Sequence, residues 1–344
     1  MSPPHTALAL LRQIGWRGPA PAGPVARVVA QHRAGYELHD GEKVFAAQPD
    51  GRFLKRKLDA SARPAVGDFV EYAPGEPALI TDILPRRTLL TRAAAGERYA
   101  HQIIAANIDY VLVLTGLDGD FNPRRIERYL LLVEGSGAQP VVLLSKADSC
   151  ADADARVAAL RERVPDAPVL AINGKDTATI QQLAPYLGPG DSAVLVGSSG
   201  AGKSTLTNTL LGETRMATGA VRTSDSRGRH TTTHRALLML PSGGCLIDTP
   251  GMRELKLTGN ESMDLFADIE ELAQRCRFAD CQHGNEPGCA VREALEAGAL
   301  DAERWRNYLK LRGERAEQAA QREARRQRNS GGHRPSPKGS HPHR

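Results

Sequence analysis

The sequence lacks any apolar run long enough to cross a membrane. A spanning helix needs about 18 or more consecutive apolar residues, and no stretch of the 344 residues approaches that length. The first 20 residues also lack a secretory signal, because the apolar stretch from Leu8 to Ile14 is too short for one. We therefore expect a cytoplasmic protein that makes no contact with membranes.

Cysteine is scarce as well: the chain has five, an odd number, and three of them are crowded together. In a reducing compartment, such crowding indicates a metal site rather than disulfides. The crowded segment reads Cys276-x4-Cys281-x-His283-x5-Cys289, which offers three thiolates and one imidazole to a tetrahedral Zn²⁺. Four protein ligands leave no position for catalysis, so we expect one structural zinc ion. A chance grouping of buried cysteines is the alternative.

Positive charge is concentrated near the C-terminus. The net charge of the chain is +5, but Glu303 to Arg344 contains 12 Lys and Arg against 4 Glu, which leaves 33 basic and 36 acidic residues before it. The C-terminal part is therefore expected to bind a polyanion, although a solvated charged helix would have the same composition. Ala302 to Arg328 is predicted to be helical, and residues 331–344 to be a disordered tail.

The length favours two or three domains. Residues 1–22 are predicted to be an N-terminal extension that ends in a Gly/Pro-rich linker. Residues 23–95 contain five short strand patterns separated by turn signals, which favours a small β-barrel such as an OB-fold. Within this region, Gly51 to Lys57 places four cations beside an aromatic residue, which suits either a nucleic-acid contact or a solvated basic loop.

Residues 96–258 have a different pattern, in which strands and helices alternate. Apolar strand patterns begin near Tyr110, Pro140 and Pro168, and helical patterns lie between them. This alternation predicts an α/β domain with a parallel sheet and helices on both faces. The following residues, 259–330, are predicted to form a mostly helical, zinc-binding C-terminal domain.

A complete G-x-x-x-x-G-K-[ST] phosphate loop lies in the α/β region, between a strand pattern and a helical one. Its glycines allow backbone N–H groups to surround an anion at the positive end of the helix. Lys203 is expected to act as a catalytic charge on the β- and γ-phosphates, and Ser204 to bind Mg²⁺. A purely structural glycine-rich turn is the alternative. The predicted nucleotide-binding residues of the loop are Gly197, Ser198, Ser199, Gly200, Ala201, Gly202, Lys203, Ser204 and Thr205.

A second phosphate-side motif, Asp248-Thr249-Pro250-Gly251, follows a later strand pattern. Asp248 is expected to hold a water of the Mg²⁺ shell, and Gly251 to sense the γ-phosphate, as in a nucleotide switch. Thr232 lies in the polar stretch between the two motifs and can bring a hydroxyl to the Mg²⁺. By itself the tetrapeptide could also be an ordinary turn.

Ser145-Lys146-Ala147-Asp148 at a strand end resembles the Asn/Thr-Lys-x-Asp guanine clamp of GTPases. Asp148 would accept hydrogen bonds from guanine N1–H and N2–H₂, which adenine does not offer, while the stem of Lys146 lies along the base. Ser145 differs from the usual Asn or Thr, so guanine preference rests mainly on Asp148, and a surface loop is the alternative. Asp148 precedes Gly197 by 49 residues, whereas the clamp of an ordinary GTPase follows the phosphate loop. The order indicates circular permutation, because strands can keep their places in a sheet when only the connections differ.

Together these features closely resemble the RsgA/YjeQ family of circularly permuted GTPases. The resemblance covers about residues 25 to 320 and includes Asp120 to Leu130, Gly228 to Thr233 and the zinc pattern. It implies an N-terminal OB-fold, a permuted G domain and a zinc-binding C-terminal domain. It also implies GTP hydrolysis in late maturation of the small (30S) ribosomal subunit, with binding to 16S rRNA and release after hydrolysis. The implied partners are the 30S subunit, 16S rRNA and GTP or GDP, and the protein would act as a monomer.

Catalysis is expected to need a group that the ribosome brings into place. A Ras-like enzyme orients the attacking water with a glutamine just after Asp-x-x-Gly, but here that position is Met252. Intrinsic hydrolysis should therefore be slow, and His230 is the candidate catalytic residue, unless it makes only an RNA or structural contact. Two other function classes stay open: an ATP-using P-loop enzyme, and a zinc-bearing RNA-binding protein with a vestigial nucleotide site.

Overall fold

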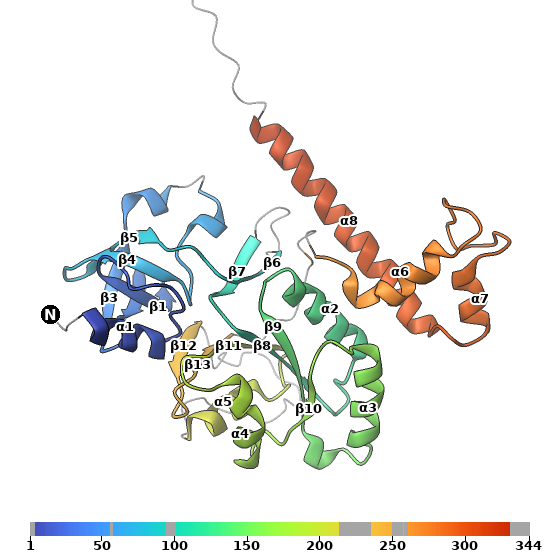
Figure 1. Cartoon of the computed structure of the whole chain (residues 1–344), viewed down its shortest axis with the longest axis horizontal. Coiled ribbons are helices and arrows are strands. Elements are labelled where there is room, and N and C mark those ends of the chain that lie inside the picture. Colours follow the sequence, from blue (N-terminus) through green and yellow to red (C-terminus); the bar gives the residue numbers. More distant parts are fainter. Residues whose placement is uncertain are drawn as a thin grey trace, which may run out of the picture.

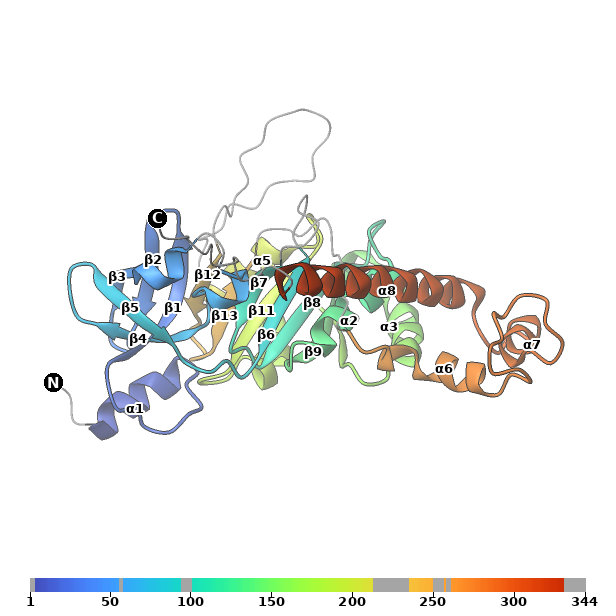
Figure 2. The same ribbon diagram turned by 90° about the horizontal axis from the view of Figure 1, so that it is seen from above.

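The computed structural model describes residues 4–55, 58–93, 101–212, 235–249, 257 and 261–330. Three parts follow one another along the long axis of the molecule: a β-barrel, an α/β sheet domain and a helical module (Figures 1 and 2). No helix within these residue ranges is both long and apolar enough to span a bilayer.

The barrel is a closed sheet of five strands. β1 pairs with β2 on one side and with β4 on the other, and β3 pairs in parallel with β5. The closed order β1-β2-β3-β5-β4 leaves no free edge in the barrel and confirms the predicted OB-fold. Its interior is filled by apolar side chains such as Val28, Leu38, Val70 and Ile80. The elements are β1 (Val25–His32), β2 (Gly35–His39), β3 (Val44–Pro49), η1 (Gly51–Leu54), η2 (Ala60–Ala62), β4 (Phe69–Ala73) and β5 (Ala78–Ile83).

Helix α1 (Pro4–Gln13) packs on the barrel. Leu11 and Ile14 are buried there, and the Trp16 ring meets Phe69 of β4 edge-on, with ring centroids 4.9 Å apart. The segment from Leu11 to Trp16 is therefore anchored by apolar contacts, although residues 1–22 are predicted to be an extension that ends in a linker. This segment packs on the barrel in spite of its linker-like composition, because its apolar side chains cover Val25 and Phe69 and remove them from water.

The sheet domain has six strands in the order β10-β9-β8-β11-β13-β12, all parallel except β12. β11, which leads into the phosphate loop, is the fourth of these strands in the chain but lies between β8 and β13. β12 also pairs with β1 of the barrel, at Ala236 and Ala30. The strands are β8 (Tyr110–Gly116), β9 (Gln139–Ser145), β10 (Val169–Ala171), β11 (Ser192–Gly197), β12 (Ala236–Met239) and β13 (Cys245–Asp248), and a separate hairpin, β6 (Leu89–Ala93) with β7 (His101–Ala106), precedes them.

Helices cover both faces of this sheet, as the alternating pattern predicts (Figure 1). Along β8, Val111 and Val113 belong to the core on the α2 side, whereas Leu112 and Leu114 belong to the core on the α5 side. Successive side chains point to opposite faces, so a strand buried on both faces is apolar throughout. The covering elements are α2 (Pro123–Glu134), η3 (Ala147–Ser149), α3 (Ala153–Arg163), α4 (Ala178–Leu183), η4 (Ala184–Tyr186) and α5 (Lys203–Leu211).

The C-terminal module is helical and shares its core with the sheet domain. The shared core contains Tyr129 of α2 and Phe266 of η5. Three side chains of α8 are buried in the same core: Trp305, Tyr308 and Leu311. α8 confirms the helix predicted from Ala302 onward; it packs along α2 and then projects beyond the sheet domain (Figure 1). The elements are η5 (Asp264–Phe266), α6 (Ala267–Gln274), α7 (Ala290–Glu296) and α8 (Ala302–Ser330).

Candidate nucleotide site and metal centre

The phosphate loop joins β11 to α5 at the carboxyl edge of the sheet. Gly197 ends β11 so close to β8 that an added Cβ would lie 2.2 Å from the Leu114 carbonyl oxygen. Gly200 and Gly202 have φ angles of +86° and +96°, which disfavour residues with a side chain. α5 then begins at Lys203, so the loop places backbone N–H groups at the positive end of a helix.

Lys203 lies within the curve of this loop. Its Nζ donates hydrogen bonds to the carbonyl oxygens of Gly197 (2.9 Å) and Ser198 (2.7 Å). Burial lowers the pKa of Lys203 to about 8, although the carboxylates of Asp248 and Asp120 act in the opposite direction. Phosphate oxygens near such a desolvated ammonium would favour its charged form.

Asp248 is brought beside the loop by the pairing of parallel strands β13 and β11, in which it lies opposite Leu195. Its side chain is buried, and this burial raises the pKa of Asp248 to about 6, while Lys203 acts to lower it. The next residue, Thr249, fixes the strand end because its hydroxyl donates to the Leu195 carbonyl oxygen at 2.8 Å. The structure therefore places Lys203 and Asp248 together, as their motifs predict.

The predicted guanine clamp lies at the end of β9, next to the phosphate loop. Ser145 is buried, and its hydroxyl donates to the Ala201 carbonyl oxygen at 2.6 Å. Lys146 has a left-handed backbone (φ +61°), which turns the chain into the short helix that carries the exposed Asp148. Ser145 thus fastens the clamp to the loop, and Asp148 is free to meet a base at the surface.

Two further acidic residues, to which the sequence motifs give no role, reach the site from the loop after β8. Asp118 accepts a hydrogen bond from Nζ of Lys146, and Asp120 accepts one from the hydroxyl of Ser198. Two signals were available: both acids come just after a predicted strand, where ligand sites in open α/β sheets lie, and Asp120 begins a stretch that carries the family resemblance. His230, Thr232 and Gly251, like Met252, lie outside the described residues, so their predicted roles stay predictions.

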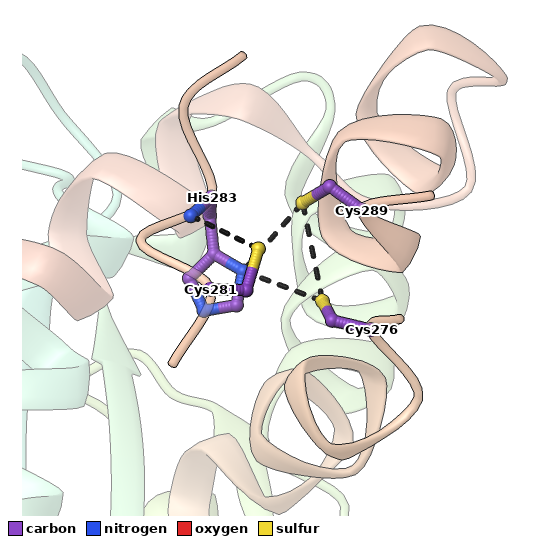
Figure 3. Close-up of side chains that lie close together, drawn as sticks. All are labelled: Cys276, Cys281, His283 and Cys289. Atoms are coloured by element: carbon purple, nitrogen blue, oxygen red, sulfur yellow. Dashed lines mark hydrogen bonds between the residues drawn. The ribbon is translucent and has the colours of Figure 1, made fainter. Parts of the chain in front are cut away.

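The predicted zinc ligands converge between α6 and α7 (Figure 3). The ligand atoms of Cys276, Cys281, His283 and Cys289 all lie within 4.8 Å of one another. Sγ of Cys276 is 3.9 Å from Sγ of Cys289 and 3.5 Å from Nδ1 of His283. A tetrahedral Zn²⁺ with bonds of about 2.3 Å to sulfur needs ligand separations of roughly 3.5 to 3.8 Å. The donor set and its spacing therefore fit one zinc ion.

Comparison with known proteins identifies the family. The profile of the family described as RsgA GTPase matches residues 83–258. A protein of Xanthomonas euvesicatoria pv. vesicatoria named "Small ribosomal subunit biogenesis GTPase RsgA" is 53% identical over 348 residues, covering 95% of each chain. One of the same name from Xanthomonas axonopodis pv. citri is 56% identical over 319 residues, covering 90% of this chain and 87% of that one. This chain belongs to the RsgA GTPase family.

Solved structures of relatives agree with this assignment. YjeQ from Thermotoga maritima is 28% identical with a TM-score of 0.60, covering 86% of this chain and 98% of its own. YloQ, described as a circularly permuted GTPase, is 25% identical with a TM-score of 0.57, covering 86% of this chain and 95% of its own. This RsgA-family protein is thus a GTPase that uses GTP with Mg²⁺, and its permuted strand order confirms the sequence prediction. The ATP-using and vestigial alternatives are not supported.

Proposed function

We propose that this GTPase acts in late maturation of the small (30S) ribosomal subunit, where it binds 16S rRNA and leaves after GTP hydrolysis. The observation that carries the proposal is one chain in which a nucleotide site lies between an OB-fold and a Cys₃His module. The names of the Xanthomonas relatives supply the biological setting. In that setting the protein works in the cytoplasm, as a monomer.

Each predicted nucleotide residue has a proposed task. The backbone from Gly197 to Thr205 surrounds the phosphates, and Lys203 neutralises charge on the β- and γ-phosphates. Ser204, Asp248 and Thr232 hold Mg²⁺, which would neutralise negative charge as the γ-phosphate leaves. Catalysis by such a site consists mainly of positioning and of stabilising charge.

The base and switch residues complete the proposed site. Lys146, Ala147 and Asp148 bind guanine, and Ser145 holds them beside the phosphate loop. Gly251 donates its backbone N–H to the γ-phosphate. His230 orients the attacking water when the small subunit is bound, since Met252 has no group that can do so.

The two flanking parts are proposed to dock on RNA. On the barrel, the exposed Arg52 has its guanidinium 4.8 Å from the centre of the buried Phe53 ring and 3.2 Å from Asp82, which holds this cation at the surface, where it can contact RNA phosphates. On the other flank, the Arg-rich α8 supplies positive charge to RNA phosphates. The zinc ion holds the module from which α8 starts.

The test is GTP hydrolysis by the full-length protein, alone and with saturating small subunits. We expect slow hydrolysis alone and strong stimulation by the subunits. Lys203→Ala should lose both activities, because the phosphate charge is no longer neutralised. His230→Ala should bind GTP normally and lose about 10²- to 10³-fold of the stimulated rate, as when one transition-state contact is removed. Equal rates with and without subunits would contradict the ribosomal role, and a normal stimulated rate in His230→Ala would exclude His230.

A further inference from the structure

The loop between β8 and α2, residues 117–122, lies between the base side and the phosphate side of the nucleotide site. Its first residue, Leu117, donates its N–H to the Ser145 carbonyl oxygen at 2.8 Å, which joins the loop to the clamp strand. A turn follows, in which the Phe121 N–H donates to the Asp118 carbonyl oxygen at 3.0 Å. The loop ends at Asn122, whose side chain caps α2 by accepting from the Arg125 N–H. Both of its ends are therefore fixed.

Asp118 connects this loop to the clamp. One carboxylate oxygen accepts a hydrogen bond from Nζ of Lys146, and the other accepts one from the N–H of Asp120 at 3.0 Å. Lys146 is the residue whose stem is assigned to the guanine base. Because Asp118 binds the far end of that side chain, it fixes where the stem runs.

Asp120 connects the same loop to the phosphate side. One oxygen accepts from the hydroxyl of Ser198, in the second position of the phosphate loop, and the other lies 2.7 Å from Arg125 of α2. A carboxylate beside a polyphosphate site repels the ligand unless it is neutralised. Arg125 and Lys146 supply one cation for each of the two acids, so Asp118 and Asp120 can hold the site without opposing the nucleotide.

We propose that residues 117–122 position both ends of the nucleotide: Asp118 fixes Lys146 against the base, and Asp120 fixes the phosphate loop through Ser198. This inference rests on the nucleotide site proposed above. Both acids are positioning residues, since each acts through another side chain. The two effects should be separable, because Lys146 binds Asp118 and Ser198 binds Asp120, although Asp118 also accepts the N–H of Asp120.

The experiment measures dissociation constants for GTP, GDP and ATP with the full-length protein. Asp120→Ala should weaken all three nucleotides by a common factor of about 10, because they share their phosphates and a hydrogen bond to a charged group is lost. Asp118→Ala should weaken GTP and GDP about 3-fold and leave ATP unchanged, since the lost ion pair is partly exposed. The matched control is Asp82→Ala, which removes an exposed Asp–Arg pair on the barrel (3.2 Å to Arg52), away from residues 117–122.

A double-mutant cycle tests whether Asp120 acts through Ser198. Ser198→Ala should match Asp120→Ala, and the double variant should bind no more weakly than either single variant. Asp120→Asn keeps an acceptor for the Ser198 hydroxyl and should recover most of the affinity. Additive losses, or equal loss of all nucleotides in Asp118→Ala and Asp120→Ala, would overturn the proposal.

Lys203→Ala separates this inference from the proposed site. If Lys203→Ala binds GTP like the parent, the nucleotide site itself is misplaced. If it loses GTP binding while Asp118→Ala and Asp120→Ala keep parent affinities, only the role of residues 117–122 is wrong.

Discussion

Ser145 shows how a residue that departs from a motif can still serve the site. Its hydroxyl replaces the side chain of the usual Asn or Thr and donates to the Ala201 carbonyl oxygen, 56 positions away in the chain. Motif comparison marks the serine only as a mismatch, because the partner that explains it is brought near by the order of the strands. The neighbouring Asp148 makes no such contact with the loop and stays exposed.

Asp148 should determine which base is bound. In Asp148→Asn the side-chain amide can donate to the extra carbonyl of xanthine but cannot accept both guanine N–H groups. We expect GTP affinity to fall at least about 10-fold, since a hydrogen bond to a charged group is lost, while xanthosine triphosphate affinity rises. Competition binding with the two nucleotides measures this, and Asp154→Asn, an exposed acid at the start of α3, is the control. Unchanged GTP selectivity in Asp148→Asn would remove this residue from the base site.

The residues of the site differ in how far the sequence predicts them. Lys203 and the cysteine cluster could be predicted because each pattern is local and its chemistry admits few other uses. The roles of Asp118 and Asp120 could not be predicted, because they depend on contacts with Lys146 and Ser198, which are 28 and 78 positions away in the chain. Such contacts depend on which strands are neighbours in the sheet.

At the scale of elements, α2 and α8 are joined by a buried polar contact. Glu127 of α2 is fully buried and accepts a hydrogen bond from the Asn307 side chain of α8. Arg163 and Arg304 lie 3.4 and 3.6 Å from its other oxygen. Burial raises the pKa of Glu127, with these two arginines and Asn307 acting in the opposite direction. Glu127 can therefore stay buried in this contact either as the neutral acid or as a carboxylate neutralised by Arg163 and Arg304.

Asn307→Asp should make the α2–α8 contact depend on pH. The two arginines that face Glu127 already face Asp268 and Asp301, so a new carboxyl would find no free cation among these groups. The pKa of such a carboxyl pair is raised in the folded state. The pair therefore leaves the folded variant stable below the ordinary carboxyl pKa of about 4.5, and this stability is lost as pH rises through the raised pKa. We expect a loss of about 2–4 kcal/mol at pH 8 and a smaller loss at pH 5.

Urea unfolding at the two pH values measures this effect. Asn307→Ala removes the same hydrogen bond without adding a charge and is the matched control. Equal losses of unfolding free energy at pH 5 and pH 8 in Asn307→Asp would show that Glu127 and the carboxyl introduced at position 307 do not share a proton.

The strands and helices themselves were largely predictable, since alternating and apolar patterns decide them. All five barrel strands and the helix from Ala302 agree with the sequence. The docking of α1 was not predictable, because Arg17 to Pro24 has the composition of a linker. Its place depends on the apolar residues Val25 and Phe69 of the barrel, which lie in the same small core as Leu11.

At the scale of the whole molecule, removing zinc should affect the C-terminal module first. The Trp305 ring lies edge-on to the ring of His283, with centroids 5.5 Å apart, so its fluorescence reports on the metal cluster. In a Trp16→Phe background, a chelator or Cys281→Ala should change this signal and expose the module to protease, because metal binding stabilises the fold. GTP affinity should stay within about 3-fold, an effect of under 1 kcal/mol. Cys150→Ala is the control, and a purified protein without stoichiometric zinc would contradict the assignment.

The barrel and the sheet domain are held together at Arg27, which is fully buried on β1. Its guanidinium donates to the carbonyl oxygens of Ile14, Gly67 (3.3 Å) and Asn107 (2.9 Å), and to the hydroxyl of Ser192 (2.7 Å) at the start of β11. One side chain thus connects the N-terminal segment, the barrel, the segment after β7 and the strand that carries the phosphate loop. A planar guanidinium with five donors can serve all four acceptors, whereas a lysine ammonium cannot.

Arg27→Met should therefore loosen the barrel from the sheet domain. Several buried acceptors would lose their donor, and each such group costs about 1–3 kcal/mol, so we expect the free energy of unfolding to fall by at least about 3 kcal/mol. Urea unfolding should remain one transition with a lower midpoint, because Val29 and Val66 of the barrel also share a buried core with Leu237 and Ile247 of the sheet domain. Arg27→Lys should recover only part of the loss. Arg33→Met, in the exposed turn after β1, is the control, and a single transition at the parent's midpoint in Arg27→Met would show that the barrel is held by other contacts.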